Sequence, residues 1–467
     1  MSCTIMTLST IDVDAITTLP EAKNVIELLL QMHQKQEERI SRLEAEIARL
    51  KGQPKKPYFS SANKQNSHSV TSLLREKSHW HKSTKGTLPV DHKESLPEVE
   101  QCSCGSIQFR TLRTTTKLVQ GIVLQRNNVS YHGRHKQCIN CGKTYKSILP
   151  KELKGISFDP SIRSLLSYLK FACRMTYPLM HRMLTGLGIR ISYGEINEIL
   201  LHNGDTLQPT HTHLRTVGFA KSNHLQSDAT GAKRKQEDGA ILNQYVQIIC
   251  NKLLSVFFIT KKYNAKTLNQ LLGKQGRKKQ FVSDDGSPNG ECLKCTNKQL
   301  CWVHEIRHYK KLFPFFTSHQ KEQKEILFQW SNFYHIAKHY GECPPEVREK
   351  KKQEIQALFD TITSQITGYE LLDKQLRLTR KKKERLLLFL DHPELPIHNN
   401  QCEQDIRQFV IIRKISGETK SIRGDRSIER HLSVIQTCQK QGLEVFQTLQ
   451  GLLTGTLAPS ILTANIH

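Results

Sequence analysis

HLQSDATG at residues 224–231 opens the stretch that decides the fold, and FVSDDG at residues 281–286 closes it. Between them stand two apolar runs rich in β-branched and aromatic residues, then a helical pattern: YVQIIC (245–250), LLSVFFIT (253–260) and NAKTLNQLL (264–272). These periods and the turn residues around them predict strand, strand, strand, helix, strand. Asp228 then lies in the first strand and Asp284 at the tip of the last, so two carboxylates occupy neighbouring strand ends.

A third acid stands far downstream, in IHNNQCEQDIRQFVIIRK (residues 397–414). Asn399 or Asn400 can cap a helix that carries Glu403 in its first turn. Three carboxylates that converge from two strands and a helix make an oxygen-rich pocket, which suits hard divalent ions such as magnesium or manganese.

The order Asp228, Asp284, Glu403, the phrase CWVHEIRHYKK (301–311) and the phrase NNxxExxIR around Glu403 resemble the DDE transposases of the insertion sequence 66 family. The resemblance covers nearly the whole chain. It implies an RNase H-like catalytic core in which these three acids hold two Mg²⁺ or Mn²⁺ ions. Asp285 is an alternative for the second acid, because the motif is a double acid.

The expected fold is therefore multidomain α+β. Between Asp284 and Glu403 lie 118 residues, and their pattern mostly predicts a helical insertion. The predicted parts are a coiled-coil helix (20–51), a basic flexible linker (52–95), a zinc ribbon (96–150), a helix-turn-helix-like domain (156–205), the first part of the RNase H-like core (215–300), the helical insertion (301–392) and the C-terminal helices of the core (393–455).

Charge is the strongest signal in the composition, because 69 Lys and Arg against 43 Asp and Glu leave a formal charge of +26. Such a basic chain favours a polyanion partner, and nucleic acid is the first candidate. No stretch reaches the roughly 18 apolar residues of a spanning helix, and residues 1–19 lack the pattern of a signal peptide. We expect a soluble, unexported protein without a membrane partner, located in the cytoplasm with the nucleoid.

Heptad positions between residues 26 and 50 predict a short coiled coil. They fall on Ile26, Leu29, His33, Gln36, Ile40, Leu43, Ile47 and Leu50. Because a Pro, Lys and Ser-rich linker follows and no neighbour is apparent for the helix, self-association into a homo-oligomer is favoured over packing on the chain's own body.

Two cysteine pairs, each followed by glycine, predict a structural zinc site: Cys102, Cys104, Cys138 and Cys141. Four thiolates would close a tetrahedral site and leave no position for substrate. A second zinc is possible at Cys292, Cys295, Cys301 and His304, which have C-x2-C-x5-C-x2-H spacing. The alternative there is that Trp302 anchors a helix and His304 faces the active site. Thirteen cysteines in a cytosolic chain indicate metal ligands or reduced thiols rather than a disulfide framework.

Two helical patterns between residues 158 and 203 flank the glycine turn GLGIRI, and Ser192 with Glu195 forms a capping box for the second. This is a helix-turn-helix layout, although plain helix packing has the same pattern. Several cations after Glu403 are candidates for DNA backbone contacts or for salt bridges to the core: Arg407, Arg413, Lys414, Arg423 and Arg426.

By resemblance, the chain is a transposase that binds the terminal inverted repeats of its element, cleaves at their 3′ ends and joins them to target DNA, with small accessory proteins as possible partners. Two residues beside Glu403 depart from the family's usual pattern: His398 stands where Asp is common, and Gln404 where Arg is common. The alternatives are a catalytically impaired or domesticated transposase that acts as a DNA-binding protein, and an RNase H-like nuclease or junction resolvase.

Overall fold

The structure is a computed structural model, and it describes residues 18–50, 90, 92–95, 100–110, 116–117, 119, 122, 124–148, 157–286 and 298–466. The chain divides into two compact units, one formed by Met1–Pro57 with Tyr131–His467 and the other by Tyr58–Ser130. Among the described residues, no helix combines the length and apolar character that crossing a lipid bilayer requires.

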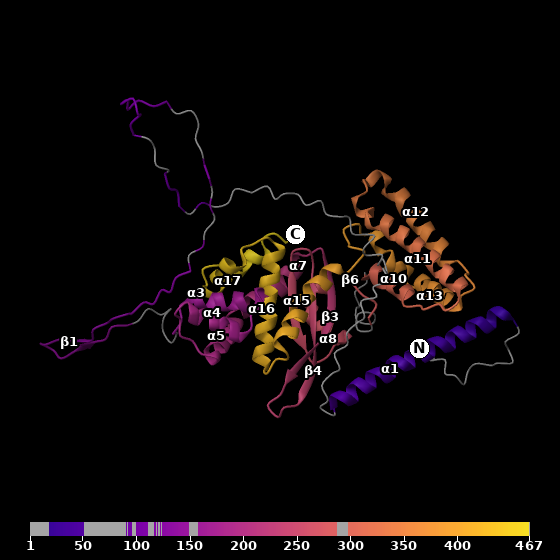
Figure 1. Ribbon diagram of the computed structural model, residues 1–467, viewed down its shortest axis with the longest axis horizontal. Coiled ribbons are helices and arrows are strands. Elements are labelled where there is room, and N and C mark those ends of the chain that lie inside the picture. Colours follow the sequence, from indigo (N-terminus) through magenta and orange to yellow (C-terminus); the bar gives the residue numbers. More distant parts are fainter. Residues whose placement is uncertain are drawn as a thin grey trace. The chain divides into compact units, whose positions relative to one another are not determined.

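A five-stranded mixed sheet is the centre of the larger unit (Figure 1). The strands are β3 (His224–Lys235), β4 (Ile241–Cys250), β5 (Ser255–Thr260), β6 (Gln280–Ser283) and β7 (Lys298–Leu300). Their order is β5-β4-β3-β6-β7, with β3, β4 and β5 antiparallel and with β6 and β7 parallel to β3. The predicted strand, strand, strand, helix, strand order is confirmed, with α8 (Ala265–Gly276) before β6. The sequence analysis missed β7, which is three residues long.

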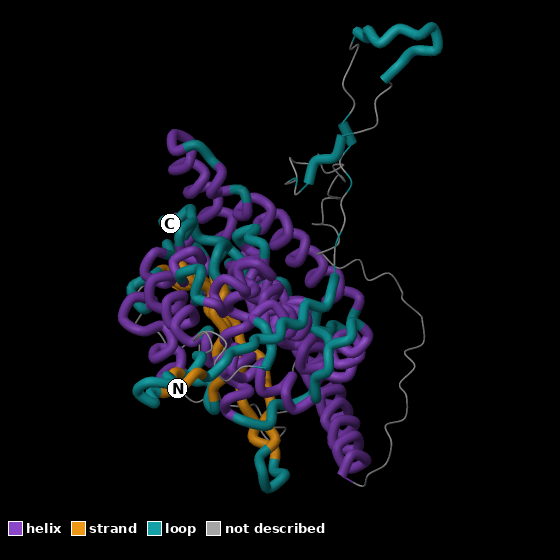
Figure 2. The backbone as a smooth tube through the Cα atoms, turned by 90° about the vertical axis from the view of Figure 1, so that its left-hand side faces the viewer, coloured by secondary structure: helices purple, strands orange, loops and turns teal. Residues whose placement is uncertain are grey.

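Helices pack on both sides of the strands (Figure 2). Residues after the insertion form α15 (Asn400–Ser416), α16 (Ile422–Lys440) and α17 (Val445–Thr454). Helix α15 lies against β3 and β4, and α16 lies against β5. The buried pattern of β5, in which five of six residues are buried, follows from this cover, because a strand covered on both faces is apolar throughout.

The predicted helix-turn-helix segment forms the helices α3 (Pro160–Ser167), α4 (Tyr177–Gly186) and α5 (Tyr193–Thr206), and α6 (Gln208–His213) and α7 (Phe219–Lys221) lead into β3. The capping box of Ser192 and Glu195 is present at the start of α5. Helices α3 to α5 share one hydrophobic cluster with the sheet, through Leu166, Met180 and Leu200. Helix α5 packs on α16, where a Cβ at Gly204 would lie 2.7 Å from Ser427.

One face of helix α5 is therefore used for packing on α16. The acidic residues of α5 would also repel the phosphates of a DNA backbone. Helix α5 carries Glu195, Glu198 and Asp205 and has neither Lys nor Arg. The helix-turn-helix interpretation stays a prediction, and plain helix packing accounts for what α5 contacts in the described part of the chain.

The helical insertion consists of α10 (Trp302–Lys310), α11 (Thr317–Lys338), α12 (Pro345–Thr363), α13 (Glu370–Lys381) and α14 (Lys383–Leu386). Its core is aromatic: Trp302 packs against Trp330, Phe333 and Phe359 with ring centroids 4.5–6.0 Å apart. The buried indole N–H of Trp302 donates to the carbonyl of Leu386 at 2.8 Å. Trp302 thus fixes the start of α10, the helix that bears the CWVHEIRH phrase.

Helix α1 (Leu19–Leu50) confirms the predicted N-terminal helix, and its first half has a neighbour that the sequence analysis did not foresee. Glu27 is fully buried, accepts from the backbone N–H of Phe315 at 2.7 Å and pairs with Nδ1 of His319 in α11. Gln31 donates to the hydroxyl of Tyr369 at 3.0 Å. The heptad residues Ile26, Ile40 and Leu43 are 48–54% exposed, so the face expected to self-associate is not covered by the described residues. Self-association stays a prediction.

Candidate active site

Two neighbouring parallel strands bring Asp228 and Asp284 side by side. In the β3–β6 ladder Gln226 is opposite Val282, so two residues further along each strand Asp228 comes level with Asp284. Strand β6 ends at Ser283, so Asp284 and Asp285 lie just beyond the ladder. The charge of Asp284 acts on Asp228, whereas Asp285 pairs with Lys382 at 2.7 Å. These interactions favour Asp284 over Asp285 as the partner of Asp228.

Helix α15 carries Glu403 in its first turn, as expected, but Asn399 does not cap it in the expected way. Asn399 occupies the N-cap position without a side-chain capping bond. Its side-chain amide donates instead to the carbonyl of Ser227 at 2.8 Å, and its backbone N–H donates to Sγ of Cys301 at 3.2 Å. Asn399 is fully buried, so it fastens the start of α15 to the residue that precedes Asp228.

The three acids act on one another electrostatically. Burial raises the pKa of Asp228 to about 6, and repulsion from Asp284 and Glu403 adds to the rise. The backbone N–H of Ala229, which donates to Asp228 at 2.8 Å, and the cation Arg307 oppose it. Within the described residues, the oxygens of the three acids do not all come within 4.8 Å of one another. The acids converge on a common region without closing around a single point.

Arg307 and His304, both from α10, face Glu403. The guanidinium of Arg307 donates to the two carboxylate oxygens of Glu403 at 3.3 and 3.4 Å, and to Nε2 of His304 at 3.0 Å. Nε2 of His304 lies 3.6 Å from the same carboxylate. Burial, then the charge of Arg307, lowers the pKa of His304. Because a guanidinium only donates, Nε2 accepts and the ring proton is on Nδ1, which is buried and has no hydrogen-bond partner among the described residues.

This position of His304 agrees with the alternative that we set against a second zinc. Cys301 is buried, and burial raises the pKa of its thiol to about 11, so the sulfur is protonated at neutral pH. Cys292 and Cys295 lie outside the described residues. The second zinc site stays a prediction, to which the described half lends no support.

A second group of charges lies at the end of β6. Ligand atoms of Asp285, Glu305 and His308 lie within 4.8 Å of one another, a spacing that could hold a metal ion. However, Nζ of Lys382 lies 2.7 Å from Asp285 and 2.8 Å from Glu305. The one ammonium bridges the two carboxylates and balances one of their two negative charges, so this group already contains an internal salt bridge.

The candidate DNA-binding cations differ in how they are used. Arg423 pairs with Glu198 at 2.6 Å and Asp205 at 2.7 Å, and Arg426 pairs with Glu429 at 2.5 Å. Arg413 donates to the carbonyl of Gly231. Arg407, one helical turn after Glu403, and Lys414 are exposed and form no ion pair within the described residues. Salt bridges to the core thus account for Arg423 and Arg426, and Arg407 and Lys414 remain available for a phosphate backbone.

Each pair of the predicted zinc ribbon forms a tight turn of its own. The N–H of Gly105 donates to the carbonyl of Cys102 at 2.8 Å, and the N–H of Gly142 to that of Cys138 at 2.9 Å. Both glycines have positive φ, at 87° and 70°, which the turn requires. The second turn closes the hairpin of β1 (Lys136–Gln137) and β2 (Thr144–Tyr145).

Backbone N–H groups point at the first sulfur of each pair. The pKa of the Cys102 thiol is lowered, chiefly by the backbone N–H of Cys104. The pKa of the Cys138 thiol is lowered in the same way, chiefly by the backbone N–H of Cys141. Turns that favour thiolates are what a metal knuckle needs. The two pairs lie in different units, so ligation by all four stays a prediction.

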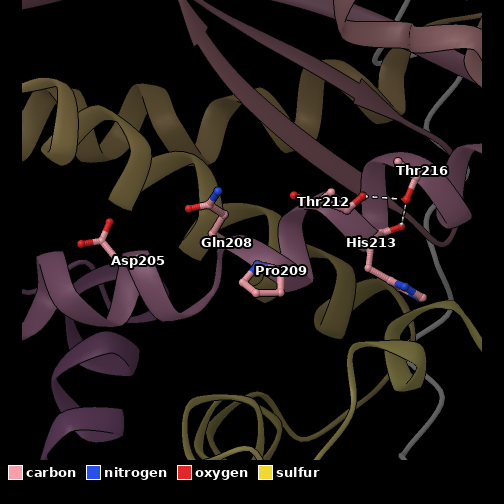
Figure 3. A pocket seen from close by; sticks show the side chains of 6 residues that line it. All are labelled: Asp205, Gln208, Pro209, Thr212, His213 and Thr216. Atoms are coloured by element: carbon pink, nitrogen blue, oxygen red, sulfur yellow. Dashed lines mark hydrogen bonds between the residues drawn. The ribbon is translucent and has the colours of Figure 1, made fainter.

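A hollow of about 540 Å³ lies away from these groups, on α5, α6 and the turn after them (Figure 3). It is lined by Asp205, Gln208, Pro209, Thr212, His213 and Thr216. The Thr216 hydroxyl donates to the carbonyl of Thr212 at 2.9 Å, within the same helical turn. The hollow includes none of the three acids and has no chemistry suited to phosphoryl transfer.

Sequence reasoning missed two features of the site. Arg307 could have been noticed, because it follows His304 by three residues and helical residues at that spacing share a face. The other is the disulfide between Cys250 in β4 and Cys402 in α15, directly before Glu403, where reduced thiols were expected. Nothing in the spacing of these two cysteines pointed to a pair 152 residues apart.

Two comparisons with known proteins place the chain in a family. A curated relative, the uncharacterized protein y4jO of Sinorhizobium fredii (strain NBRC 101917 / NGR234), is 36% identical over 171 residues, which are 36% of this chain and 50% of the relative. The chain thus spans about half the length of the curated relative it matches. Residues 155–427, more than half of the chain and including all three acids, match the family described as Transposase IS66 family. The chain belongs to the IS66 family of transposases.

Proposed function

We propose that this chain is a DNA transposase that cleaves the ends of a mobile element and joins them to target DNA, with Asp228, Asp284 and Glu403 as its catalytic acids. The observation that carries the proposal is the convergence of these acids from β3, the end of β6 and α15. Burial and then repulsion from the other two acids raise the pKa of Asp228. The strand order supports an RNase H-like core. Membership in the IS66 family supports transposition over other reactions of that core.

The three acids suit two Mg²⁺ or Mn²⁺ ions. Hard divalent ions prefer carboxylate oxygens, and mutual repulsion among the acids is what added positive charge would relieve. Asp228, Asp284 and Glu403 are the residues that would hold these ions. When bound, the ions would activate the attacking hydroxyl and stabilise the leaving oxygen.

The protein's own contribution is rigidity. Asp228 follows three buried residues of β3, and Asn399 ties α15 to that strand. In the cleavage step a water oxygen bonds to phosphorus, the bond from phosphorus to the 3′ oxygen breaks, and that oxygen takes up a proton. In strand transfer the freed 3′ oxygen loses its proton and bonds to a phosphorus of the target DNA, and the target's own 3′ oxygen leaves and takes up a proton. Glu403, in the first turn of α15, stays in place through both steps because α15 is anchored.

DNA binding is proposed for the surface that continues from Glu403. Arg407 and Lys414 follow on the same helix and are exposed. The zinc ribbon of Cys102, Cys104, Cys138 and Cys141 and the basic segments near it are proposed to bind the terminal inverted repeats. Helix α1 is proposed to join two copies of the chain, and accessory proteins remain possible partners.

The two departures from the family pattern do not remove a catalytic group. Gln404 is exposed, one position round the helix from Glu403. His398 is close enough for the charge of Glu403 to act on its pKa, which burial lowers. A neutral histidine there takes nothing from the three acids, which favours an active enzyme over an impaired one.

The test is a cleavage assay on duplexes cut from the ends of the genetic element, with Mg²⁺ or Mn²⁺. We expect Asp228→Asn and Glu403→Gln to reduce the rate by about 10³-fold or more while end binding is retained. Glu237→Gln, in the exposed turn between β3 and β4, is a matched control and should cleave normally. Unchanged cleavage by Asp228→Asn would end the assignment. Cleavage without joined products would favour the nuclease alternative.

A further inference from the structure

Arg307 differs from the other cations near the acids in having only active-site partners. Its guanidinium donates to Glu403 and to His304, and no other acid pairs with it among the described residues. Its side chain is 45% exposed, whereas that of Glu403 is 18% exposed. A buried structural cation would be held more tightly than this.

The pairing between Arg307 and Glu403 is loose. Both contacts are longer than the 2.7–2.9 Å usual for a charge-assisted bond between nitrogen and a carboxylate. An ion pair with one partner half in solvent contributes little to stability. The guanidinium can therefore leave Glu403 at small cost.

Arg307 contacts both carboxylate oxygens of Glu403, which are the atoms that a divalent ion would use. It acts on Asp228 as well, since its charge opposes the rise in the pKa of that acid. A guanidinium and a divalent ion repel each other when both approach the same carboxylate. Arg307 and a divalent ion therefore compete for Glu403.

We propose that Arg307 is a catalytic residue that exchanges partners: it pairs with Glu403 when the site is free, and it binds the non-bridging oxygens of the scissile DNA phosphate when the site is loaded. This rests on the proposed function. A planar guanidinium matches the oxygens of a phosphodiester in a bidentate way, and a positive charge there stabilises the negative charge that builds up in the transition state. His304, which accepts from the same guanidinium, is a positioning residue that keeps Arg307 beside the site during the exchange.

The test has two readouts on the full-length protein, Mn²⁺ binding by titration calorimetry without DNA, and cleavage of element ends. Arg307→Gln should bind Mn²⁺ about three- to fivefold more tightly, because the competing cation is gone. The same variant should cleave about 10²- to 10³-fold more slowly, with end binding little changed. Arg307→Lys should keep wild-type Mn²⁺ affinity and still cleave slowly, since an ammonium lacks the planar fork.

Lys311→Gln removes one charge from the exposed end of the same helix and is the control for net charge. If Arg307→Gln binds Mn²⁺ no more tightly than Lys311→Gln does, the proposal that Arg307 competes with the ion for Glu403 is wrong. If Arg307→Gln binds Mn²⁺ more tightly yet cleaves at the wild-type rate, the proposal that Arg307 contacts the scissile phosphate is wrong. Because the calorimetry needs no turnover, these results differ from failure of the proposed function, in which the wild type does not cleave and Glu403→Gln binds Mn²⁺ as the wild type does.

Discussion

Two groups of carboxylates meet at the end of β6, and they are neutralised in different ways. On one side, Asp285 and the buried Glu305 share the ammonium of Lys382 at 2.7 and 2.8 Å, and Glu305 also accepts from the hydroxyl of Thr379 at 2.6 Å. On the other, Asp228, Asp284 and Glu403 face the half-exposed Arg307, more than 3 Å from Glu403. Adjacent residues in the chain, Asp284 and Asp285, thus enter opposite environments.

The difference lies in the cation. Lys382 is 20% exposed and bridges two acids at short distance, so the group around Glu305 is held together by a fixed cation. In the group around Asp228, burial first and then repulsion from Asp284 and Glu403 raise the pKa of Asp228. Acids with a perturbed pKa in a cluster are typical of catalytic sites, whereas tightly held pairs are typical of structure. The predictions below test this contrast.

The largest effect on stability is expected at the group around Glu305. Lys382→Met leaves the buried carboxylate of Glu305 without its cation, and we expect the free energy of unfolding to fall by about 2–4 kcal/mol. Arg307→Met, at the other group, should change it by less than about 1 kcal/mol, because its pair is partly solvated. The thermal midpoints of the two full-length variants measure the difference.

The double variant Glu305→Gln with Lys382→Met serves as the control. Removing both charges together should restore most of the lost stability, because the cost comes from the unpaired carboxylate rather than from the missing contact. Equal losses in Lys382→Met and Arg307→Met would contradict the contrast between the two groups.

A smaller effect, and one that depends on pH, is expected at Asp228. Its pKa is about 6 in the folded protein against an ordinary value of 3.8, so between about pH 4 and pH 6 the folded protein holds a proton that the unfolded chain releases. The free energy of unfolding therefore falls as the pH rises through this window, and the stability that protonation gave is absent above it. Asp228→Asn should be more stable than the wild type at pH 8, by at most about 3 kcal/mol, and similar to it at pH 4.

The measurement is thermal unfolding of both proteins across pH 4 to 8, without divalent ions. Adding Mn²⁺ at pH 8 should stabilise the wild type and leave Asp228→Asn nearly unchanged, because only the wild type relieves its repulsion by binding. A variant that is less stable than the wild type at pH 8 would show that Asp228 is already satisfied within the fold.

Much of this site could be predicted from the sequence, for a reason that is local. Asp284 directly follows a buried strand, as expected, whereas Asp228 lies inside β3 and not at the expected strand end. The two acids still come together because β3 and β6 pair in parallel. Glu403 is in the first turn of a helix whose start the two preceding asparagines predict. Asn399, however, donates to the carbonyl of Ser227 and does not cap the helix with its side chain. The spacing of apolar residues and the residue types that form turns are local properties of the chain. They can therefore be seen in the sequence itself.

The rest depends on contacts between distant segments. Arg307 meets Glu403 across 96 residues, and Lys382 meets Asp285 only because α13 packs on α10. Glu27 is buried because α11 supplies His319 and the N–H of Phe315, although its own neighbours in the chain look like a solvated helix. The spacing of residues along the chain does not indicate contacts between distant segments. The partners of these cations and buried acids could therefore not be predicted from the sequence.

The smallest effect is expected from Asp285→Asn, which bears on the choice of the second acid. Asp285 is held by Lys382 at 2.7 Å, so its loss should slow cleavage by less than about tenfold and leave Mn²⁺ affinity unchanged. Asp284→Asn should instead behave like Asp228→Asn in both assays. The two variants differ by one position and make the same chemical change, so each controls for the other. A reversed result, with Asp285→Asn inactive and Asp284→Asn active, would mean that the strand register changes when DNA is bound, and it would transfer the catalytic role to the acid that Lys382 now neutralises.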